Sequence, residues 1–168
     1  MGNNASDYAI IRVTPTLSTD AYAQGDVLFT ATAIPDAVRG DAGSSLLLAM
    51  YLVNQVTTEV DIDFIFSEGN TALGTINATA DIDDTEIQAL SVTGLMTLDG
   101  SASKTTQLDV CNITKVHNVD GTVDAATPML LQAAAGTTSV YVQGILTGSA
   151  TPTYTADAID LIFHIQYQ

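Results

Sequence analysis

Apolar and polar residues alternate along much of this chain, which is the pattern of half-buried β-strands. Residues 58–67 show it most clearly, with one face formed by Val60, Ile62, Phe64 and Phe66. The opposite face of that segment carries Glu59, Asp61 and Asp63. Residues 45–55 are instead apolar on both faces, as expected of a strand buried between two layers. We expect these two neighbouring segments to form a β-hairpin.

The same reasoning predicts strands over most of the remaining chain. We expect them at residues 8–17, 27–33, 95–98, 107–116, 129–134, 139–147 and 156–167. Asp120-Gly121 has the residue types of a two-residue hairpin turn. Residues 129–134 and 139–147 read as a further hairpin around residues 135–137.

One helix interrupts the strands. Asp83 with Glu86 three positions later has the spacing of a capping box, and Ile87 with Leu90 gives a short apolar stripe. This predicts a helix near residues 83–93. Eight or nine short strands at this spacing favour an all-β fold, an antiparallel β-sandwich of jelly-roll type. We expect a single domain over residues 1–168, in which residues 1–7 could form an extended N-terminal arm.

Charge restricts the partners that such a domain can have. The chain has 19 Asp and Glu against four Lys and Arg, a net charge of −15, and its cations are Arg12, Arg39, Lys104 and Lys115. A nucleic-acid site often neutralises roughly six to ten phosphates, which four scattered cations cannot do. The negative field also opposes binding to an anionic membrane surface. We therefore expect neither nucleic acid nor membrane as a partner. The N-terminus shows no signal-peptide pattern.

The best candidates for catalysis are Glu59, Asp61 and Asp63. A period of two places these carboxylates on one strand face, about 7 Å apart. Paired carboxylates can hydrolyse glycosides, but a solvated strand face explains them as well, and the chain has no Trp to form a sugar platform. We therefore expect no enzymatic activity.

Metal binding has weak candidates in Asp81, Asp83 and Asp84, whose oxygens could hold Ca²⁺. The EF-hand pattern is absent, however, and helix capping accounts for Asp83. His117 and His164 lack the spacing of a zinc site, and Cys111 reads as a small buried strand residue. We expect no metal and no cofactor.

Several blocks of the sequence resemble a known class of protein. They are residues 11–17, 25–29, 34–39, 44–47, 63–66 with 73–74, and 134–142. Together these blocks resemble the short acidic structural proteins encoded with the head genes of tailed bacteriophages, notably capsid decoration or cement proteins. The matching blocks are spread over about residues 10–165, whereas residues 101–124 match nothing in that class.

The resemblance implies a β-rich homotrimer that binds the major capsid protein on the outer surface of the virion. We expect the contact to involve the N-terminal arm, residues 1–7, and the loop at residues 34–43. The candidate contact residues are Arg12, Ile34, Pro35 and Arg39.

A second interpretation is a receptor- or glycan-binding β-sandwich from a phage fibre or spike. Such a module usually presents exposed aromatic side chains in its loops. In this sequence the candidates for that role are Tyr22 and Tyr154.

Overall fold

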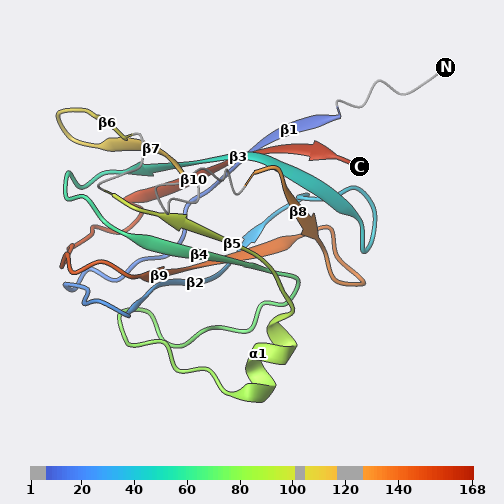
Figure 1. Cartoon of the computed structure of the whole chain (residues 1–168), viewed down its shortest axis with the longest axis horizontal. Helices are drawn as coiled ribbons and strands as arrows, with labels where there is room; N and C mark the ends of the chain where they lie inside the picture. Colours follow the sequence, from blue (N-terminus) through green and yellow to red (C-terminus); the bar gives the residue numbers. More distant parts are fainter. Residues whose placement is uncertain (1–6, 101–104, 117–126) are drawn as a thin grey trace.

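The computed structural model describes residues 7–100, 105–116 and 127–168, and it consists of two antiparallel β-sheets packed face to face (Figure 1). The six-stranded sheet contains, in spatial order, β1 (Tyr8–Val13), β10 (Ile159–Tyr167), β3 (Ser44–Asn54), β7 (Asn112–Val116) and β6 (Thr105–Gln107), and β8 (Met129–Gln132) also pairs with β3. The four-stranded sheet has the order β2 (Val27–Ile34), β9 (Val140–Leu146), β4 (Ile62–Ser67) and β5 (Val92–Leu98). One helix, α1 (Asp84–Leu90), lies between β4 and β5.

The strand order confirms the expected jelly-roll sandwich. From β1 to β4 every connection crosses from one sheet to the other, and so does the connection from β9 to β10. As a result β10 lies between β1 and β3, and β9 lies between β2 and β4. This interleaving of early and late strands is the double Greek key of a jelly roll.

Aromatic side chains from both sheets fill the space between them. The rings of Phe66 on β4 and Phe163 on β10 meet edge to face, with centroids 6.2 Å apart, and so join the two sheets. Within the four-stranded sheet, Phe29 and Phe64 have centroids 6.3 Å apart. All four rings are fully buried. Edge-to-face pairs of this kind stabilise a core beyond the area that they bury.

Both expected hairpins between long strands are wrong. Strand β3 belongs to the six-stranded sheet and β4 to the four-stranded one, so residues 45–55 and 58–67 face each other across the sandwich. Likewise β8 pairs with β3, whereas β9 lies between β2 and β4. A period of two identifies a strand and its buried face, but it carries no information on which strand is the hydrogen-bonded partner.

Strand β3 also differs from its expected environment. Its inner face, which includes Leu47 and Leu52, is buried, but Leu46, Leu48 and Tyr51 on the other face are only half-buried. The strand therefore has one covered face and one apolar face that no described residue covers fully.

Two further expectations concern residues 107–121. The single strand expected at residues 107–116 is instead the hairpin β6–β7, whose turn is closed by a 2.8 Å hydrogen bond from the backbone N–H of Leu108 to the carbonyl of Cys111. The expected turn at Asp120-Gly121 lies outside the described residues.

The helix is confirmed at its start and is shorter than expected at its end. Asp83 is the N-cap, and the reciprocal hydrogen bonds of a capping box with Glu86 are both present. The helix ends at Leu90 because Ser91 adopts a left-handed conformation with φ 50°, and β5 begins at the next residue. In Figure 1 the segment that contains α1 lies against the outer side of the four-stranded sheet. Leu73 and Leu90 pack there with Val27 in a second, smaller hydrophobic cluster.

A substitution of Gly144 provides a test of how closely the core is packed. It lies on β9, opposite Phe29 on one side and Phe64 on the other. A Cβ at this position would lie 2.5 Å from Cε1 of the buried Phe29 ring. Gly144→Ala should therefore lower the free energy of unfolding by about 1–3 kcal/mol in urea titrations. The same substitution should cost less in a Phe29→Leu background, and an equal cost in both backgrounds would contradict this contact.

Candidate interaction surfaces

The loop at residues 34–43 meets Asp7, the residue before β1, and Tyr167, the last residue of β10, at one corner of the sandwich. The Arg39 guanidinium lies 4.5 Å from the centroid of the Tyr167 ring, and its Nη1 is 3.3 Å from Oδ1 of Asp7. The Tyr167 hydroxyl donates a 3.0 Å hydrogen bond to the backbone carbonyl of Asp36. We call Asp7, Asp36, Arg39 and Tyr167 the Arg39 corner. It brings together the loop and the end of the N-terminal segment, the two elements that the sequence predicted to act together.

Buried anchors hold this loop in place. The backbone carbonyl of Ala37 accepts a 2.6 Å hydrogen bond from the Ser45 hydroxyl in the interior, and Ala37 and Val38 are both buried. Ile34 is also completely buried, so it belongs to the core and cannot contact a partner from the surface. Pro35 and Arg39 are exposed. The accessible part of the loop is therefore smaller than the sequence suggested.

The contacts of Arg39 within the chain are individually weak. The side chains of Arg39 and Asp7 are 39% and 74% exposed, and exposed ion pairs of this kind contribute about 0–1 kcal/mol. Exposed cation–π contacts contribute about 0.5–1 kcal/mol. The Arg39–Asp7 ion pair therefore contributes little to the stability of the fold.

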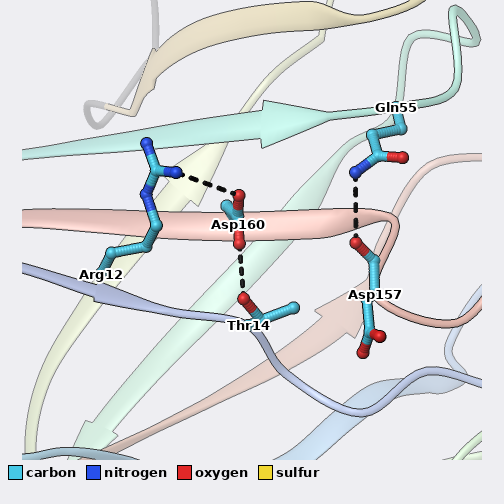
Figure 2. A network of polar contacts seen from close by, with 5 residues as sticks. All are labelled: Arg12, Thr14, Gln55, Asp157 and Asp160. Atoms are coloured by element: carbon cyan, nitrogen blue, oxygen red, sulfur yellow. Dashed lines mark hydrogen bonds and ion pairs between the residues drawn. The ribbon is translucent and has the colours of Figure 1, made fainter.

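Arg12 lies elsewhere, on the outward side of β1. Figure 2 shows its guanidinium directed at Asp160 of β10, with Nη1 3.7 Å from Oδ2. The Thr14 hydroxyl donates a 2.5 Å hydrogen bond to Oδ1 of the same carboxylate. Arg12 is four residues along β1 from Tyr8, roughly 13 Å, so the structure does not bring it into the Arg39 corner.

The outward side of the six-stranded sheet is apolar, which the sequence reasoning missed. Strand pairing places Tyr8, Ile10 and Arg12 of β1 on the same side as Ile162 of β10 and Tyr51 of β3. The large apolar side chains most exposed on this side are Ile10 at 71%, Tyr8 at 58% and Leu130 at 54%. We call it the outer face, formed by Tyr8, Ile10, Arg12, Leu46, Leu48, Tyr51, Val53, Ile113, Lys115, Leu130, Asp160, Ile162, His164 and Gln166. The sequence feature that could have indicated this apolar surface is the second apolar face of residues 45–55.

Charge is distributed unevenly around the molecule. The six strands of that sheet contain two cations, Arg12 and Lys115, and one carboxylate, Asp160. Two positive charges less one negative give +1, against −15 for the chain. On the opposite side, the segment over the four-stranded sheet carries Glu68, Asp81, Asp83, Asp84 and Glu86. The acidic groups are thus in the connections, and the outer face is nearly free of them.

Two of the three carboxylates considered for catalysis make structural hydrogen bonds, Asp61 to the turn after β5 and Asp63 to the neighbouring strand β5. Asp61 accepts a 2.8 Å hydrogen bond from the backbone N–H of Gly100, and Asp63 accepts one of 2.7 Å from the Thr97 hydroxyl. Glu59 is exposed and lies before β4. A structural role therefore accounts for Asp61 and Asp63.

The metal candidates have a similar explanation. Oδ1 of Asp83 accepts 2.8 Å hydrogen bonds from the backbone N–H groups of Thr85 and Glu86, while Asp81 and Asp84 are exposed. Within residues 7–100, 105–116 and 127–168 no group of three or more His, Cys, Asp and Glu side chains is arranged to hold a metal ion.

The remaining titratable candidates are dispersed. His164 lies on the outer face, 5.2 Å from the Tyr51 ring. Cys111 is half-buried next to β7 rather than buried within a strand, as the sequence suggested. His117 lies outside the described residues.

The two tyrosines expected in exposed loops are in fact buried. Tyr22 and Tyr154 are 1% and 2% exposed, and their rings pack edge to face with centroids 5.7 Å apart. The Tyr22 hydroxyl donates a 3.0 Å hydrogen bond to the carbonyl of Leu28. Both residues do lie in connections, but their rings turn inward. Neither can stack on a sugar.

Comparison with known proteins adds no relative: the sequence matches no protein-family model, and no curated protein is significantly similar to it. In the part of the chain that the structure describes, no helix has the length and apolar character needed to cross a membrane.

The Asp83 cap gives a test of the metal hypothesis. Asp83→Ala should lower the free energy of unfolding by about 1 kcal/mol, whereas Asp83→Asn should retain the cap. Millimolar CaCl₂ should leave the melting temperature of the wild type and both variants unchanged. A Ca²⁺-dependent rise in the wild type that Asp83→Asn abolishes would show that these carboxylates bind metal.

The buried tyrosines make stability depend on alkaline pH. Burial raises the pKa of both Tyr22 and Tyr154 above the ordinary value of 10. Above about pH 10 the unfolded chain therefore loses these protons first, and the free energy of unfolding falls as pH rises. Tyr154→Phe should make this fall shallower in urea titrations between pH 9 and 12. An unchanged slope would contradict the assignment.

Proposed function

We propose that this chain is a structural protein of a tailed-phage virion that binds the outer surface of the capsid and stabilises it. The observation that carries the proposal is the Arg39 corner. The loop at residues 34–43 and the last residue of the N-terminal segment, Asp7, meet there through Arg39. These are the two elements through which we expected contact with the major capsid protein.

The fold and the charge are consistent with this role. Jelly rolls occur in viral capsid proteins and also in lectins, so the fold permits the proposal without deciding it. A net charge of −15, carried mostly in the connections, keeps free copies soluble and would keep coated particles apart.

The alternative is a receptor- or glycan-binding module of a fibre or spike. Burial of Tyr22 and Tyr154 removes the aromatic residues on which that interpretation depended. Tyr8 is the most exposed tyrosine of the described residues and would have to replace them. Binding to a glycan array that Tyr8→Ala abolishes would favour the alternative.

Removal of the Arg39 charge tests the proposal. Arg39→Gln and deletion of residues 1–7 should each weaken co-sedimentation with capsids stripped of this protein, Arg39→Gln by roughly 5–30-fold, since interface contacts of this kind contribute about 1–2 kcal/mol. Lys104→Gln removes the same charge and is the matched control, because Lys104 is in neither the Arg39 corner nor the outer face as defined above. Undiminished binding by both the Arg39 variant and the deletion would contradict the proposed contact. Absence of the protein from purified virions would contradict the function itself.

A further inference from the structure

The two sheets of the sandwich differ in what covers their outward sides. The four-stranded sheet is covered by the segment between β4 and β5, where Leu73, Leu90 and Ile82 pack against Val27 and Ile65. The outer face of the six-stranded sheet has no comparable cover among the described residues. Figure 1 shows this contrast, with α1 and its flanking segments on one side of the sandwich only.

The outer face has the dimensions of a protein interface. Its six strands contain 38 residues in all, at roughly 3.3 Å per residue along a strand and roughly 4.8 Å between neighbouring strands. The face is therefore about 600 Å², comparable with the roughly 800 Å² that each partner contributes to a standard interface. Apolar side chains make up only part of this area, because Arg12, Asp160 and Lys115 also lie on the face. Exposed apolar side chains that gather on one face commonly mark an interaction site.

We propose that a second copy of this chain covers the outer face. Two molecules of charge −15 repel each other wherever their acidic connections meet. The outer face is the side on which that repulsion is smallest, because its one carboxylate, Asp160, already accepts contacts from Arg12 and Thr14. Association through this face buries Ile10 and Leu130 and leaves the acidic connections in solvent.

This surface is separate from the Arg39 corner. Ile10 lies on β1 and Leu130 on β8, on either side of the β10–β3 pair, and both point away from the sandwich core. Copies joined through this face keep Arg39 and Asp7 accessible at the end of the sandwich. The inference holds whether or not the chain binds a capsid, since it concerns the purified protein alone.

Ile10→Asp is the direct test, because it places a negative charge in the centre of the exposed apolar side chains of β1. Ile87→Asp is the matched control, since Ile87 is also an exposed isoleucine, 41% accessible, but lies on α1 at the opposite side. Sedimentation equilibrium of the wild type at micromolar concentrations should show an oligomer rather than a monomer. Ile10→Asp should weaken self-association by more than about 100-fold, because a buried charge would be left unpaired, whereas Ile87→Asp should behave as the wild type.

Three results would overturn the inference. They are a monomeric wild type at 100 μM or above, an Ile10→Asp variant that associates as tightly as the wild type, and an Ile87→Asp variant that dissociates equally. Leu130→Asp provides a second variant on another strand of the same face, and circular dichroism establishes that each variant is folded. If stripped capsids bind the monomeric Ile10→Asp variant, self-association and capsid binding use different surfaces. If the wild type forms an oligomer but does not bind stripped capsids, the proposed capsid function is contradicted and the self-association inference is not.

Discussion

A β-sheet has two faces, and packing two sheets together covers only the inner face of each. In this chain the rest of the structure depends on whether the outward face of each sheet is covered by other residues. The segment between β4 and β5 closes one of them with a small cluster around Leu73 and Leu90. The outer face of the six-stranded sheet keeps Ile10, Leu130 and their neighbours at the surface. Water contact with that much apolar area is unfavourable, which favours a partner there.

The placement of charge follows the same division. Nearly all carboxylates lie in the connections, and Asp160 is the single one in the six strands that form the outer face. Repulsion between acidic connections opposes association of two copies wherever those connections meet, and it is smallest on the nearly neutral outer face. The Arg39 corner, at the end where the N-terminal segment enters β1, adds a cation to an otherwise acidic region.

Local features of the fold could be predicted from the sequence, but the hydrogen-bonded partner of each strand could not. The alternation in residues 58–67 identified β4 and its buried face, and Asp83 with Glu86 identified the helix start. The partners of β3 and β9 escaped prediction because jelly-roll pairing joins strands far apart in the sequence. Tyr22 and Tyr154 were expected at the surface because they lie in connections between strands, although both side chains are buried.

The candidate sites divide in the same way. Arg39 could be found as a cation in an acidic loop, and Ile34 was wrongly included because its burial depends on strand β2 packing against the opposite sheet. The outer face was missed since the apolar second side of residues 45–55 was attributed to a second covering layer. Only the arrangement of the strands reveals that no described segment supplies that layer.

The salt dependence of self-association tests this account most directly. Apolar burial on the outer face should drive association, and repulsion between acidic connections should oppose it. Raising NaCl from about 0.05 to 0.5 M shortens the screening length severalfold, so sedimentation equilibrium of the wild type should show tighter association at high salt. Association that weakens with salt would point to ion pairs instead, and no association at either salt concentration would contradict the account.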